Sequence, residues 1–96
     1  MSPNNKKKLS ILRKKLDILD DSLIILIKRR TDIVKKVLKL KKHKKEIVDN
    51  RRIKNILKNI RKKSIQKNID PKITNRIWKN MIWSYINFEK RNFKKK

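Results

Sequence analysis

Leucine, isoleucine and valine recur along the first part of the chain with the spacing of one helix face. Between residues 9 and 40 they advance by alternating steps of three and four, which favours a long α-helix whose apolar stripe faces a partner helix. No Gly or Pro interrupts residues 9–42, so we expect one helix about 50 Å long. The stripe consists of Leu9, Leu12, Leu16, Leu19, Leu23, Leu26, Ile33, Val37 and Leu40.

Two shorter helices are predicted after a Lys-rich connector at residues 41–46. Asp49 occupies the position of a helix N-cap, and the helix that follows it should end around residues 66–68. Its predicted buried face comprises Ile53, Ile56, Leu57, Ile60 and Ser64. Asp70 and Pro71 then begin a third helix, because Pro is favoured at the first helical position.

The first predicted helix is too long for one small domain to cover. A compact chain of 96 residues has a radius of gyration of about 12 Å, so a second chain is needed to cover the apolar stripe. We therefore predict an all-α fold with three helices per chain in an interlaced homodimer. The helical domain should span residues 9–93, between a disordered leader at residues 1–8 and a basic tail at residues 94–96.

The charge balance is extreme, with 32 Lys and Arg residues against 8 Asp and Glu residues and a formal net charge of +24. Such a balance is typical of nucleic-acid-binding proteins. Lys greatly outnumbers Arg and both Gly and Ala are absent, which indicates a genome poor in G and C, and the lysines are spread along the whole chain. We therefore interpret the charge chiefly as solvated surface, and keep a basic helical nucleic-acid-binding protein as an alternative from another class.

Several kinds of chemistry are excluded by missing residue types. The chain has no Cys and only one His, His43, which excludes disulfides, thiolate zinc sites and histidine-cluster metal sites. It also lacks a phosphate-binding Gly loop and a set of residues for nucleophilic catalysis. No apolar run approaches the roughly 20 residues that span a bilayer, and residues 1–8 lack a signal-peptide core, so we expect a cytoplasmic protein. We expect no metal and no cofactor.

Three basic residues of the first helix and its end suggest an anion site. Arg30 interrupts the apolar stripe after Leu26, and a guanidinium there is costly unless an anion meets it. Lys41 lies about 16 Å further along the same helix face, so Arg30 and Lys41 could hold the two ends of a small dianion. Arg13 lies about 25 Å from Arg30, too far for the same ligand, but antiparallel first helices would bring it to the partner's site. The simpler alternative is that Arg30 extends its guanidinium to solvent.

Two further polar residues lie beside predicted apolar faces. Glu89 follows Tyr85 by four residues on the third helix, so its carboxyl is either paired with a cation, such as a nearby Arg, or kept protonated by burial. Arg52 begins the second helix next to the core residue Ile53, where an ordinary surface arginine is the alternative.

These positions together resemble the all-helical class of chorismate mutases over about residues 9–93. Residues 12–20 read L-R-K-K-L-D-I-L-D, which is similar to the L-R-x-x-[IL]-D-x-[IL]-D opening of that class. The remaining matches are Leu26, Ile27, Lys28, Arg29, Arg30, Val37, Lys41, Asp49, Arg52, Ile56 and Leu57. The resemblance implies a three-helix protomer in an interlaced homodimer that rearranges chorismate to prephenate, in aromatic amino-acid biosynthesis.

The resemblance also implies roles for individual residues. Arg13 would reach from the partner chain to one substrate carboxylate, and Arg30 would bind a carboxylate. Lys41 would contact a carboxylate and the ether oxygen. Glu89 would occupy the position from which a Gln or Glu donates a hydrogen bond to that oxygen.

Asp49 and Arg52 would line the ring side of the substrate, and Ile53 and Tyr85 would be further substrate-binding residues. Ile53 departs from the family pattern, because many members have a Glu there that meets the substrate hydroxyl. The aromatic-rich third helix and Ile53 are similar to the related isochorismate pyruvate lyases, although those usually have Gln at the position of Glu89. A lyase of the same fold therefore stays an alternative.

Overall fold

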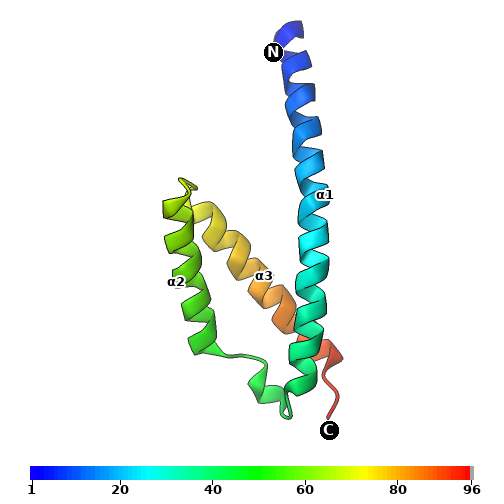
Figure 1. The fold of residues 1–96 in the computed structure, drawn as a ribbon, viewed down its shortest axis with the longest axis vertical. Coiled ribbons are helices and arrows are strands. Elements are labelled where there is room, and N and C mark those ends of the chain that lie inside the picture. The colour runs from blue at the N-terminus through cyan, green and yellow to red at the C-terminus, as the bar shows by residue number, and fades with distance from the viewer. Residues whose placement is uncertain (96) are drawn as a thin grey trace. The chain divides into compact units, whose positions relative to one another are not determined.

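The computed structural model describes residues 1–95 as three α-helices (Figure 1). They are α1 (Pro3–Leu40), α2 (Asn50–Gln66) and α3 (Pro71–Asn92), and a short 3₁₀ turn, η1 (Lys44–Glu46), lies between α1 and α2. No strand occurs among residues 1–95. The predicted all-α fold with a long first helix is confirmed.

The chain divides into two compact units, Met1–Ile33 and Val34–Lys96. The first unit is the N-terminal and larger part of α1 with the two residues before it. The second unit contains the last turns of α1, the connector with η1, and the helices α2 and α3.

Helix α1 begins earlier than the sequence pattern suggested. Residues 3–8, expected to belong to a disordered leader, are helical. The Ser2 hydroxyl accepts a hydrogen bond from the Asn5 N–H at 3.2 Å, and the Ser2 carbonyl accepts one from the Lys6 N–H at 2.9 Å. Ser2 therefore caps the helix, and Pro3 begins it where the missing N–H costs nothing.

The predicted apolar stripe is largely exposed within the first unit. Leu12, Leu16 and Leu19 are 55%, 57% and 59% exposed, and Leu23, Leu26 and Ile33 are exposed to a similar degree. A second set of exposed isoleucines, Ile11, Ile18 and Ile25, recurs every seven residues on the same helix. A continuous apolar surface of this kind on a monomeric helix is characteristic of an interaction site.

The starts of α2 and α3 are confirmed as predicted. Asp49 caps α2 and accepts the Arg52 N–H at 3.0 Å, and Asp70 caps α3 and accepts the Lys72 N–H at 2.9 Å. Both carboxylates satisfy amides that a helix start leaves unpaired. Helix α2 ends at Gln66, and Asn68 has a positive φ of 57°, a conformation that Asn tolerates well.

Helices α2 and α3 are neighbours: α2 leads to the turn that joins them, and α3 leads back from it (Figure 1). Near this turn the buried hydroxyls of Ser64 and Thr74 lie 2.6 Å apart, and the Ser64 hydroxyl donates to the Ile60 carbonyl. Because both hydroxyls are satisfied, the pair can be buried between the helices without a free polar group.

The core of the second unit joins the end of α1 to α3 and the connector. Its buried apolar residues are Leu38, Ile47, Ile82 and Ile86. Partly buried apolar residues pack against them, namely Val48, Ile53, Ile56, Leu57 and Phe93. This core fixes the last turn of α1 against α3 and thereby determines where the chain continues after Leu40.

Candidate active site

Lys41 and Glu89 form an ion pair between the end of α1 and the last turns of α3. The Lys41 Nζ lies 3.1 Å from Glu89 Oε1 and 3.3 Å from Glu89 Oε2. The side chains are only 18% and 7% exposed. Of the two alternatives for Glu89, pairing with a cation is confirmed, but the cation is Lys41 and not a nearby arginine.

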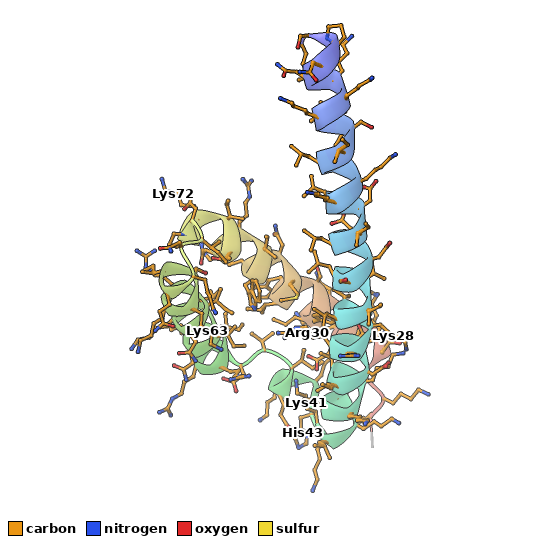
Figure 2. All side chains as sticks on the ribbon, turned by 45° about the horizontal axis from the view of Figure 1, so that its top comes forward. Lys28, Arg30, Lys41, His43, Lys63 and Lys72 are labelled. Atoms are coloured by element: carbon orange, nitrogen blue, oxygen red, sulfur yellow. The ribbon has the colours of Figure 1, made fainter. Side chains whose placement is uncertain are left out.

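The connector after α1 holds Lys41 in this position. The backbone N–H of Lys41 donates to the Leu38 carbonyl at 3.1 Å, and this hydrogen bond closes the last turn of α1. Figure 2 labels Lys41 and His43 at this end of α1, where the chain turns into the connector. Glu46 then accepts the His43 N–H at 3.2 Å, and Ile47, 4% exposed, anchors the connector in the core.

The acidic residues of the second unit are all engaged locally. Glu46 binds the connector backbone, Asp49 and Asp70 cap helices, and Glu89 pairs with Lys41. No ion pair in the described part of this unit neutralises a surface lysine or arginine. Lys and Arg greatly outnumber the four acidic residues of this unit, so the unit carries a strong net positive charge, which favours the approach of anionic ligands.

Arg52, Ile53 and Tyr85 lie in the same unit as the ion pair. Arg52 is exposed in the first turn of α2, and Ile53 packs partly buried against the core. Tyr85 is partly buried one helical turn before Glu89, so the two share a face of α3. Asp49 accepts the Arg52 N–H, so its carboxylate already has a role in capping α2.

Arg13 and Arg30 are exposed residues of α1 in the first unit. Neither guanidinium takes part in an ion pair within residues 1–95, although Lys28 and Asp32 pair beside Arg30 at 2.8 Å. Because Lys41 belongs to the second unit, the joint site of Arg13, Arg30 and Lys41 stays a prediction.

One residue and one contact that position the site were not predicted from the sequence. Ile47 follows a run of charged residues and has no periodic apolar neighbours, so no pattern indicated its burial. The ion pair joins Lys41 to Glu89, 48 residues further along the chain, and helix periodicity cannot predict a contact between such distant residues.

Neither a metal cluster nor a membrane span is found in the described chain. Residues 1–95 contain no group of three or more His, Cys, Asp or Glu side chains that could hold a metal ion. None of the helices formed by these residues is both long enough and apolar enough to cross a bilayer.

Comparison with protein families identifies the chain. Searches of curated proteins and of solved structures gave no significant match. The family model described as chorismate mutase type II matches residues 12–90, which include Arg13, Arg30, Lys41 and Glu89. The match covers most of the chain, with the whole of α2 and the greater part of α1 and α3. The chain therefore belongs to the chorismate mutase type II family, isomerases that convert chorismate to prephenate.

Proposed function

We propose that this chorismate mutase works as an interlaced homodimer, in which each active site combines Arg30, Lys41 and Glu89 of one chain with Arg13 of its partner. The observation that carries the proposal is the Lys41–Glu89 pair, with 18% and 7% of the side chains exposed. A partly buried ammonium and a buried carboxyl that lie 3.1 Å apart can act on the same substrate atom.

The reaction needs no nucleophile and no proton transfer. Chorismate rearranges within one molecule, because a bond to its ether oxygen breaks as a carbon–carbon bond forms. Catalysis then consists of holding the dianion in its compact, reactive conformer and stabilising the negative charge that develops on the ether oxygen.

Lys41 and Glu89 act on the ether oxygen. The Lys41 ammonium supplies a point charge, and it is strengthened by low exposure to water. Glu89 contributes a hydrogen bond only when it carries a proton, because a carboxylate has no hydrogen to donate. For both groups to donate to the ether oxygen, Glu89 must take up a proton from solvent when the substrate replaces its contact with Lys41.

The arginines bind the two carboxylates of the substrate. A guanidinium presents a planar fork that matches a carboxylate, which suits Arg30 and the partner's Arg13. The exposed apolar stripe of α1 supports a second chain packed along it, and antiparallel packing would bring each Arg13 toward the other chain's Arg30. Asp49, Arg52, Ile53 and Tyr85 then line the ring of the substrate.

We place this activity in the cytoplasm, in the synthesis of aromatic amino acids. The support is the nature of the reaction.

Alanine variants test these roles directly. Arg30→Ala and Lys41→Ala should each lower kcat/KM for chorismate about 10² to 10³-fold. Lys41 donates to the developing charge, a contribution of roughly 3 to 4 kcal/mol, and we expect a similar loss when Arg30 no longer holds a substrate carboxylate. Lys42→Ala is a matched control, because Lys42 is the exposed neighbour of Lys41 and has no proposed contact. Near-wild-type rates for Arg30→Ala and Lys41→Ala, with far-ultraviolet circular dichroism unchanged, would contradict the assignment.

A further inference from the structure

A cavity of about 400 Å³ lies at the C-terminal ends of α1 and α3, beside the segment that follows α3. Its apolar lining is Leu38 and Phe88, and its basic lining is Lys35, Lys39, Lys94 and Lys95. All these residues belong to the second unit. The volume is within the range of pockets that hold small organic molecules.

The lining of the cavity contains four lysines and no carboxylate. Neither of the ion pairs found in residues 1–95 involves these lysines. No carboxylate of the lining offsets the mutual repulsion of the ammonium groups within the cavity. An anion in the cavity would relieve that repulsion.

Leu38 and Phe88 determine which anion fits best. An inorganic ion would gain only charge interactions and would leave this apolar wall in contact with water. An anion with an aromatic or other apolar body would also bury the wall, and burial of apolar surface contributes about 25 cal/mol per Å². The Asn92 side chain is held by its hydrogen bond to the Phe88 carbonyl at 2.8 Å, which keeps this part of the wall in place.

This cavity is separate from the proposed active site. Lys41 and Glu89 are not part of its lining. Lys35 and Lys39 are four residues apart on α1 and therefore share one face of the helix. Val37 of the apolar stripe lies two residues from each lysine, so it points to the opposite side of the helix, about 160 to 200° around the axis. A partner helix packed along the stripe would therefore leave both lysines uncovered.

We propose that the cavity binds a small organic anion, with one carboxylate or sulfonate held by the lysines and an apolar body against Leu38 and Phe88. The site is defined by its lining and does not depend on the proposed catalytic roles.

Titration with 8-anilinonaphthalene-1-sulfonate, an aromatic anion, tests the proposal on the full chain. Its fluorescence should rise to saturation, and amide chemical-shift changes should centre on Leu38, Phe88 and Asn92. The double variant Lys35→Glu/Lys39→Glu should bind the dye about tenfold more weakly or worse, since opposite charge replaces attraction by repulsion. The control Lys58→Glu/Lys62→Glu changes net charge equally on α2 and should keep the affinity within about twofold.

Three results would overturn the proposal. Equal loss of dye affinity in both double variants would mean that binding follows net charge alone. Shift changes along the apolar stripe of residues 9–33 in place of the cavity would mean that the dye binds α1. Displacement of the dye by inorganic sulfate at an equal concentration would mean that the apolar wall contributes nothing. Circular dichroism of each variant establishes that it is folded before its affinity is compared.

Discussion

Replacing Lys41 by Met removes the ammonium but keeps much of the side-chain length, which isolates the ion pair. At the observed 3.1 and 3.3 Å, attraction between unit charges is about 5 kcal/mol for an effective dielectric constant of about 20. Desolvation of both groups offsets much of this attraction. The loss of one partner, however, leaves the Glu89 carboxylate with 7% exposure and no cation.

The expected cost of Lys41→Met is therefore about 3 kcal/mol in the free energy of unfolding at neutral pH. Glu89→Leu should cost less, because the more exposed Lys41 can extend toward water. The double variant Lys41→Met/Glu89→Leu should lie within about 1 kcal/mol of the wild type, since neither charge is then buried alone.

Urea unfolding followed by circular dichroism measures these differences, at one protein concentration because a dimer's stability depends on it. The double-mutant cycle should give a coupling energy of about 2 kcal/mol or more between the two positions. Additive costs, or a cost below about 1 kcal/mol for Lys41→Met, would refute the claim that the pair is a buried, coupled contact.

Three further predictions address the active site shared between two chains, the hydrogen-bond donor at position 89 and the packing of α2 against α3. Arg13→Ala and Arg30→Ala chains should each be nearly inactive. Refolding the two together in equal amounts should restore about a quarter of wild-type activity, because about half the dimers are mixed and each mixed dimer has one intact site. No recovery of activity would contradict the shared site. Glu89→Gln should keep kcat/KM for chorismate near the wild-type value, because an amide always has a hydrogen to donate, whereas Glu89→Leu should lower it about 10² to 10³-fold; equal rates in the two variants would exclude the donor role. Thr74→Val should lower the free energy of unfolding, measured in urea, by about 1 kcal/mol, because the 2.6 Å hydrogen bond with Ser64 is lost. It should leave kcat/KM unchanged. An unaltered unfolding midpoint would show that this hydrogen bond contributes nothing.

Helix starts that depend on neighbouring residues were predicted well. Asp49 and Asp70 cap their helices because the capping oxygen and the amide it accepts are two or three residues apart, which the sequence displays directly. Ser2 and Pro3 carry the same signal, but the polar residues after them lacked the apolar periodicity used to define the first helix. The start of α1 was therefore placed too late.

The sequence did not specify which distant segments contact each other, and it left the partner of Glu89 open between a cation and a proton. The apolar face around Glu89 indicated that its carboxyl needed a cation or a proton, but not that Lys41, 48 residues away, supplies the cation. Ile47 and Thr74 are buried by the way the connector and α3 pack, which no local pattern specifies. The resemblance of the first helix to a known family, by contrast, rested on residue identities at fixed spacing, and the family match over residues 12–90 confirmed it.

Incubation of the purified chain with chorismate tests the central claim most directly. Chromatography against authentic standards should show chorismate converted to prephenate, at a rate that Arg30→Ala lowers about 10² to 10³-fold. Two results would contradict the assignment of Arg30, Lys41 and Glu89 to a chorismate mutase site. One is chorismate left unchanged, and the other is release of pyruvate when isochorismate is supplied in place of chorismate.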